Sequence, residues 1–153
     1  GITTLNLAMN LPEGSKVYTF DLEAPIKKRH PRDRLVMNAH FQNKKRLAFK
    51  GSIYEGRVVQ LFGDSTEYDF SKYRSSMDLV FVDGGHDLLT ITKDTETAFD
   101  MVKDGGVIVW HDYLNKSHPK LLKFFSSLAN KRSMVHVEET MLCYTIVKRK
   151  GEM

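Results

Sequence analysis

Two short polar runs, Asp83-Gly84-Gly85-His86 and His111-Asp112-Tyr113, each follow an apolar run of about the length of a buried strand. Aspartate and histidine side chains gathered at one place can bind a divalent cation. They can also transfer a proton, because the unperturbed pKa of histidine lies close to neutral. We therefore predict that the chemistry of this chain is located where the two polar runs meet.

Residues 77–113 predict one βαβ unit that brings these runs together. Met77–Val82 has the apolar composition of a strand buried on both faces, and Val107–Trp110 begins a second buried strand. Asp87 can cap an intervening helix, and Asp104-Gly105-Gly106 supplies a stop with glycine in the left-handed position. The predicted buried face of this helix consists of Leu88, Ile91, Thr95, Ala98, Phe99 and Val102. A right-handed crossover makes the strands parallel and places Asp83, His86, His111 and Asp112 at one carboxyl edge.

The rest of the chain continues the alternation of strands and helices. Helices are predicted at 2–11, 35–46 and 119–129, a loop at 24–34, and strands at 16–22, 56–62, 134–137 and 141–148. The last two strands are separated only by the turn 138–140, which predicts an antiparallel hairpin. We therefore expect a single α/β domain over residues 1–153, with a Rossmann-like, doubly wound, mostly parallel sheet that ends in this hairpin.

Composition favours a globular protein in a reducing compartment. Of the 153 residues, 41% are hydrophobic and 27% are charged, and no apolar run approaches the roughly 20 residues of a membrane span. The single cysteine, Cys143, excludes an intrachain disulfide and lies in a predicted strand, where a buried, inert thiol is expected. These features favour a cytoplasmic protein without a membrane partner; they do not predict an oligomeric state.

Positive charge is concentrated between residues 24 and 50. Nine lysines and arginines against one aspartate give this segment a charge of +8, so the remainder of the chain carries −4. A basic loop and helix of this kind can be a solvated face, a site for an anionic small molecule or partner, or a nucleic-acid surface. Nucleic acid is the weakest of these interpretations, because no known nucleic-acid module accompanies the cluster.

Several motifs together resemble a known family. They are Gly1-Ile2-Thr3-Thr4 before a helix, Val17-Tyr18-Thr19-Phe20-Asp21, Gly63-Asp64-Ser65, the Asp78–His86 strand and loop, and Gly105–Tyr113. This combination resembles the class I S-adenosylmethionine-dependent methyltransferases. Within them it is most similar to the small-molecule branch described as methyltransferase domain 24, which is similar to the catechol-type and macrolide-sugar O-methyltransferases.

The resemblance implies S-adenosylmethionine as cofactor and assigns residues to it. Asp21 would accept hydrogen bonds from the ribose hydroxyls, with Glu23 as the alternative acid, and Asp64 and Ser65 would contact the adenine. Asp83 would lie where the cofactor meets the acceptor. Gly1 would be the end of a glycine-rich loop, and the resemblance implies that the rest of this loop and a central first strand precede Gly1 in the parent protein.

For the chemistry, the resemblance leaves two options open. Asp83, His111 and Asp112 would bind Mg²⁺ or, because His111 offers nitrogen, a softer divalent metal. Alternatively His86 would be the general base, with Asp83 and His111 as catalytic neighbours. The implied reaction is methyl transfer to an oxygen of a small molecule such as a sugar or another polyhydroxy compound, and the acceptor could be anionic. The alternatives are an RNA methyltransferase, a degenerate nucleotide-binding domain without catalysis, and a nicotinamide-linked Rossmann enzyme.

Overall fold

The computed structural model describes residues 1–23 and 47–149. It divides into two compact units, residues 1–65 and 66–153. The predicted loop at 24–34 and helix at 35–46 lie outside the described residues, so those two predictions stay untested. Within the described ranges, every helix is too short or too polar to cross a lipid bilayer.

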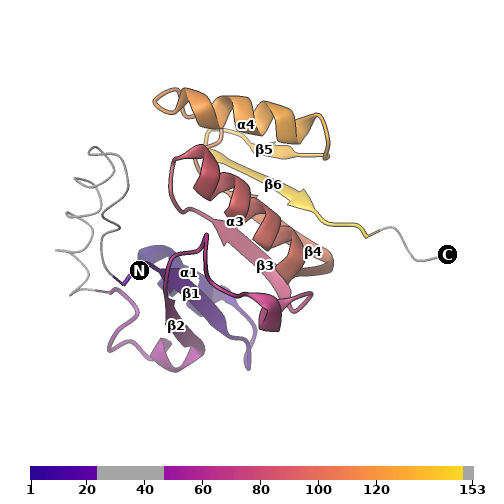
Figure 1. Ribbon diagram of the computed structural model, residues 1–153. Helices are drawn as coiled ribbons and strands as arrows, with labels where there is room; N and C mark the ends of the chain where they lie inside the picture. Colours follow the sequence, from indigo (N-terminus) through magenta and orange to yellow (C-terminus); the bar gives the residue numbers. More distant parts are fainter. Residues whose placement is uncertain (24–46, 150–153) are drawn as a thin grey trace. The chain divides into compact units, whose positions relative to one another are not determined.

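The first unit contains a two-stranded parallel sheet. Its elements are α1 (Ile2–Asn10), β1 (Val17–Asp21), the 3-10 helix η1 (Glu55–Arg57) and β2 (Val58–Phe62) (Figure 1). The guanidinium of Arg57 donates to the carbonyl oxygens of Ala8 (3.2 Å) and Leu11 (3.0 Å) and so satisfies acceptors at the end of α1. The strand predicted from residue 56 begins instead at Val58, because residues 55–57 form the 3-10 turn.

The second unit contains a four-stranded sheet in the order β3-β4-β6-β5. Its elements are η2 (Ser71–Tyr73), β3 (Met77–Val82), α3 (Leu88–Met101), β4 (Val102–Trp110), α4 (Pro119–Ala129), β5 (Val135–Val137) and β6 (Leu142–Ile146). Strands β3 and β4 are parallel, whereas β6 is antiparallel to both β4 and β5. The predicted strand at 77–82, helix at 119–129 and terminal hairpin are therefore confirmed.

Helices α3 and α4 lie on one face of this sheet (Figure 1). The core beneath them is formed by Val82, Ile91, Ala98, Val102, Ile108, Trp110, Leu121, Phe125, Cys143 and Val147. Trp110 is fully buried, and its indole Nε1 donates to Oγ1 of Thr95 at 2.9 Å. This bond satisfies a buried donor and joins α3 to the end of β4.

The end of α3 differs from the prediction. The helix stops at Met101, and Val102 begins β4 instead of continuing the buried helix face. Gly105 does have a left-handed φ of 78°, but it lies within β4, where its N–H donates to the carbonyl of Val147 at 2.8 Å. Burial of Val102 in the core and pairing with the chain after β6 keep this segment extended, so the two glycines do not act as a helix stop.

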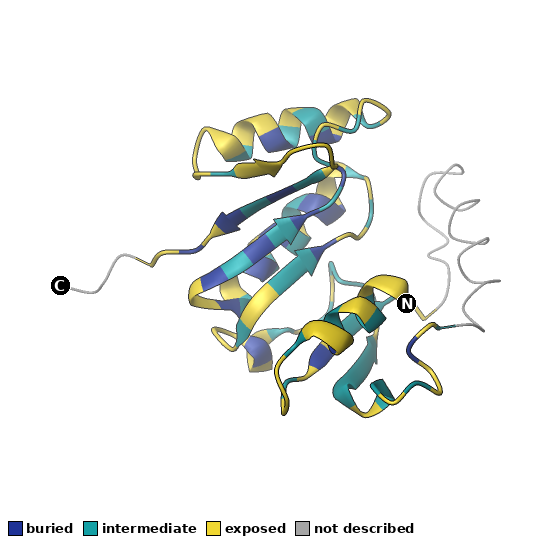
Figure 2. Cartoon of the chain, turned by 180° about the vertical axis from the view of Figure 1, so that it is seen from behind, coloured by how far each residue is buried: buried dark blue, intermediate teal, exposed yellow. Residues whose placement is uncertain are grey.

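Burial also differs from two expectations. Leu79 of β3 is 44% exposed, so this strand is not buried on both faces, because α3 and α4 cover one face of the sheet. Figure 2 shows intermediate and exposed positions on the strands seen from the other side. Leu88, placed by its spacing on the buried face of α3, is 50% exposed because it is the first residue of the helix.

Candidate functional site

The two polar runs meet at the carboxyl edge of β3 and β4, as predicted. Val82 is opposite Trp110 in the parallel register, so Asp83 and His111 follow the strand ends side by side. The backbone N–H of His111 donates to the carbonyl of Val82 at 3.1 Å and extends the pairing by one residue. The βαβ topology therefore brings acids and imidazoles together from positions almost thirty residues apart.

Asp83, His111 and Asp112 form a group with the composition of a cation site. The Nδ1 atom of His111 lies 3.3 Å from Oδ1 of Asp83 and 3.3 Å from Oδ2 of Asp112. One ligand atom from each residue can be chosen so that all three lie within 4.8 Å of one another. Among the described residues, Nδ1 of His111 is buried without a well-formed hydrogen bond, so the nitrogen and two carboxylates fit a shared cation.

The pKa values of the two carboxyl groups in this cluster are shifted in opposite directions. Partial burial raises the pKa of Asp83, and repulsion by Asp112 adds to the rise, although His111 and His86 oppose it. Burial also raises the pKa of Asp112, but the hydrogen bond from Asn115 and the nearby His86 and His111 outweigh that effect and lower its pKa overall. The fold therefore favours the ionised form of Asp112 and disfavours that of Asp83.

His86 pairs with Asp112 across the cluster. Its Nε2 lies 2.9 Å from Oδ2 of Asp112, a side chain that is only 11% exposed. The other oxygen of Asp112, Oδ1, accepts from the side-chain amide of Asn115 at 2.7 Å. In the neutral ring, a proton on Nε2 is favoured by this carboxylate, which leaves the lone pair on Nδ1 to accept a proton.

His118 belongs to the same cluster, although it was not among the predicted site residues. Its ring stacks on the ring of His86, with centroids 4.4 Å apart and planes within 7°. Asn115 was also missed. The signal that could have found both is their place in the short segment between the polar strand end and Pro119, which begins α4.

The residues predicted for the ribose and adenine lie in the first unit. Asp21 ends β1 opposite Phe62, so it shares a carboxyl edge with the run 63–65 that follows β2. The backbone supports this proximity, because the N–H of Gly63 donates to the carbonyl of Asp21 at 3.0 Å. Glu23 is exposed, and Gly1 is the N-cap residue of α1. The structure thus places Asp21, Asp64 and Ser65 at one edge, and their predicted contacts with a cofactor stay predictions.

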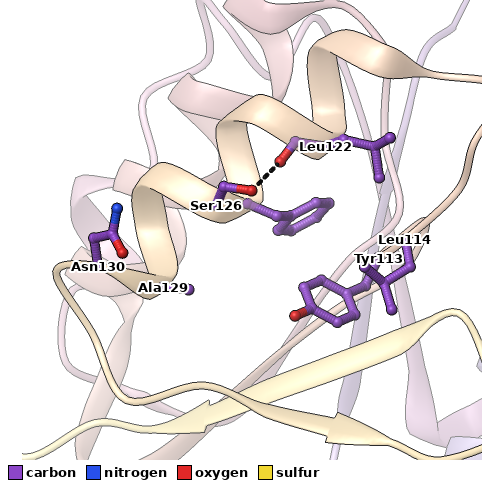
Figure 3. Close-up of a pocket in the computed structure, with 7 residues that line it drawn as sticks. Tyr113, Leu114, Leu122, Ser126, Ala129 and Asn130 are labelled. Carbon is purple, nitrogen blue, oxygen red and sulfur yellow. Dashed lines mark hydrogen bonds between the residues drawn. The ribbon is translucent and has the colours of Figure 1, made fainter.

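A separate pocket of about 310 Å³ lies between α4 and the residues that follow Asp112 (Figure 3). It is lined by Tyr113, Leu114, Leu122, Phe125, Ser126, Ala129 and Asn130. The rings of Tyr113 and Phe125 meet edge to face, with centroids 5.5 Å apart. The walls are mostly apolar, with the phenol hydroxyl of Tyr113 and the amide of Asn130 among them.

Comparison with known families decides the classification. The family model of methyltransferase domain 24, described as a methyltransferase domain, matches residues 1–113. The chain belongs to this family. The match covers β1 to β4 and the polar strand ends, and it confirms the predicted resemblance to the class I S-adenosylmethionine-dependent methyltransferases.

Solved structures of methyltransferases share the fold. The O-methyltransferase NovP is 12% identical, with a TM-score of 0.54 over 88% of this chain and 60% of its own. The MycE methyltransferase from the mycinamycin biosynthetic pathway, solved in complex with Mg and SAH, is 17% identical with a TM-score of 0.52. That alignment covers 97% of this chain and 48% of MycE, so the chain spans about half to three-fifths of these proteins. No curated protein sequence matches the chain.

Proposed function

We propose that this methyltransferase domain transfers a methyl group from S-adenosylmethionine to a hydroxyl oxygen of a small molecule, such as a sugar or another polyhydroxy compound. The observation that carries the proposal is the cluster of Asp83, His111, Asp112 and His86 at one sheet edge of a methyltransferase-family domain. Acids and imidazoles in contact suit the activation of a hydroxyl group. The O-methyltransferase fold of NovP supports the same reaction.

S-adenosylmethionine supplies a methyl group bound to a positively charged sulfur. In our proposal, the carboxylate of Asp21 accepts hydrogen bonds from the ribose hydroxyls, with Glu23 beside it in sequence as the second acid. Asp64 and Ser65, at the same edge of β1 and β2, contact the adenine. Gly1 lies near the methionine part of the cofactor. The complex of MycE with SAH supports a cofactor of this type in the shared fold.

Asp83, His111 and Asp112 would hold a divalent cation. A cation bound there would orient the acceptor hydroxyl and lower its pKa. The two carboxylates favour Mg²⁺, which is present in the MycE crystals, whereas the nitrogen of His111 also admits softer ions such as Mn²⁺. The raised pKa of Asp83 fits the role, because a nearby positive charge would stabilise the ionised form that partial burial disfavours.

His86 receives the proton in our proposal. Nε2 of His86 lies 2.9 Å from Oδ2 of Asp112, and this contact favours a proton on Nε2, so Nδ1 carries the lone pair that takes the proton of the acceptor hydroxyl. The hydroxyl oxygen then forms the new bond to the methyl carbon as the carbon–sulfur bond breaks and its electron pair stays on sulfur. The Asp112 carboxylate stabilises the resulting imidazolium, and the remaining rate enhancement comes from alignment of the oxygen with the methyl group.

The pocket beside Tyr113 would take an apolar part of the acceptor. Tyr113 follows Asp112 directly in the chain, so a molecule whose hydroxyl lies at the cluster can extend toward α4. Filling the pocket by Ala129→Phe should raise the KM for an acceptor with an apolar group. Ser127→Phe, an exposed position of α4 outside the pocket lining, is the control and should leave the KM unchanged.

Calorimetry with S-adenosylhomocysteine tests the cofactor assignment. Loss of charge-assisted hydrogen bonds in Asp21→Ala should weaken binding by about 1 to 3 kcal/mol. Asp78→Ala removes an aspartate whose side chain is 85% exposed and should leave the affinity unchanged. Equal affinity of wild type and Asp21→Ala would remove Asp21 from the site.

A chelator separates the two options for the chemistry. Methyl transfer that is lost with chelator and restored by Mg²⁺ or Mn²⁺ supports the cation at Asp83, His111 and Asp112. Full resistance to chelator together with loss of activity in His86→Ala supports a histidine base alone. If neither the chelator nor alanine at any of the four positions altered transfer, this edge would not be the active site. Methylated nucleosides as the product would favour the RNA methyltransferase alternative.

A further inference from the structure

The segment from Asp112 to His118 closes on itself through side-chain and backbone bonds. The amide nitrogen of Asn115 donates to Oδ1 of Asp112 at 2.7 Å, while its Oδ1 accepts from the N–H of Ser117 at 3.0 Å. The N–H of His118 donates to the carbonyl of Asn115 at 3.1 Å. Asn115 therefore links the carboxylate at one end of this segment to the backbone at the other end.

Both ends of the segment contact His86. The carboxylate of Asp112 holds the edge of its ring through Nε2 at 2.9 Å, and the ring of His118 covers one of its faces at 4.4 Å. His86 itself follows Gly84 and Gly85 in an irregular connection between β3 and α3, and its side chain is 37% exposed. Its local chain therefore does little to fix the ring, and the two contacts from the facing segment do so instead.

The side chain of His118 has no role in capping α4. His118 occupies the N-cap position, where a side-chain acceptor commonly bonds the first free N–H groups, yet its side chain makes no such bond. The start of the helix is formed by the His118 carbonyl, which accepts from the N–H groups of Leu121 and Leu122. The imidazole is left for the stack with His86.

We infer that His118 is a positioning residue for His86. Its ring fixes the plane of the His86 imidazole so that Nε2 faces Asp112 and Nδ1 is presented to the acceptor hydroxyl. This inference rests on the proposed function of His86 as proton acceptor. It assigns His118 a role that is exerted through the ring of His86.

The stack is tested first without activity, by NMR of the His86 ring protons. Removal of the stacked ring in His118→Ala should shift these resonances, whereas His118→Phe, which keeps a flat ring, should leave them close to their wild-type positions. Lys120→Ala, an exposed change in the first turn of α4, is the control for a general disturbance of this segment. An unchanged His86 spectrum in His118→Ala, or an equal shift in Lys120→Ala, would overturn the inference.

Kinetics tests the consequence. Misalignment of the base should lower kcat about tenfold in His118→Ala, with the KM for the acceptor unchanged, and His118→Phe should restore most of the loss. A change in KM alone, or a phenylalanine variant as slow as the alanine variant, would overturn a positioning role. Affinity for S-adenosylhomocysteine should be equal in all variants. Failure of the wild-type protein to bind that ligand would reject the proposed function, while the NMR comparison would still decide how His86 is held.

Discussion

Asp112→Asn tests the electrostatics of the cluster most directly. The substitution keeps size and shape, and Asp112 has a φ of 60°, a left-handed conformation that asparagine tolerates well. This carboxylate accepts a hydrogen bond from Asn115 at 2.7 Å, and Nε2 of His86 contacts it at 2.9 Å. The charge is the only large change, so the fall in the free energy of unfolding measures what that charge contributes to stability.

The magnitude follows from this hydrogen bond and this ion-pair contact. A hydrogen bond to a charged group contributes about 1.5–3 kcal/mol and a neutral one about 1 kcal/mol, and a contact with His86 of similar strength brings the loss to roughly 1–4 kcal/mol. Removing a buried charge recovers part of that loss, because the amide is cheaper to desolvate. We expect the free energy of unfolding to fall by about 2 kcal/mol at pH 7, or roughly 1 M in the urea midpoint.

The pH dependence has a definite sign. The pKa of Asp112 is lower in the folded protein than the value of about 3.9 in an unfolded chain, so its stabilisation is fully present above that value. The stabilisation is lost as pH falls through the folded pKa, because both states then bind the proton. The stability difference between wild type and Asp112→Asn should therefore close in acid, as the pH falls through the folded pKa of Asp112.

The assay is urea unfolding followed by circular dichroism, with a chelator present so that bound cations do not contribute. Asp78→Asn is the matched control, because Asp78 is 85% exposed and, within the described residues, forms an ion pair only with Lys103, so it should change stability by less than about 0.5 kcal/mol. Equal stability of wild type and Asp112→Asn at pH 7, or a gap that persists unchanged in acid, would refute this account of the cluster.

Three further predictions concern single side chains. Asp83→Asn should stabilise the protein at neutral pH, because the pKa of Asp83 is higher in the folded protein than in the unfolded chain. The wild-type protein therefore loses stability as the pH rises from the unfolded pKa toward the folded pKa, whereas the asparagine variant does not. Urea unfolding at several pH values should show that the gain in stability vanishes in acid. Thr95→Val should cost about 1–3 kcal/mol in urea unfolding by leaving the buried Nε1 of Trp110 without an acceptor, whereas Thr95→Ser, which keeps the hydroxyl, should cost less. Cys143, fully buried with burial raising its pKa to about 12, should react with a thiol reagent only after unfolding; rapid labelling of the native protein would contradict that placement.

The sequence determined the main elements of the second unit. An apolar run bounded by polar residues set the limits of β3, and Pro119 with a periodic apolar face set those of α4. Asp87 caps α3 as predicted, because its side chain accepts from the N–H of Thr90 at 2.9 Å. These features depend on neighbours in the chain, so local patterns were sufficient.

Local sequence patterns gave a wrong prediction where packing in the core determines the backbone conformation. Asp104-Gly105-Gly106 has the composition of a helix stop, yet it lies in β4, because Val102 is buried and the chain after β6 supplies hydrogen-bond partners. No neighbour in sequence signals that pairing. The helix consequently ends at Met101, earlier than its composition suggests.

The candidate site also has one part that the sequence predicted and another that only the structure shows. Parallel strands separated by a helical crossover necessarily bring their carboxyl ends to one edge, so the sequence alone placed Asp83, His111 and Asp112 together. The contacts of His86 with Asp112 and with His118 depended on the path of the segment after β4. That path passes through left-handed conformations at Asp112 and Leu114, neither of which is glycine, and such conformations are held by surrounding contacts. Only the tertiary structure could therefore show which edge and which face of the His86 ring are held.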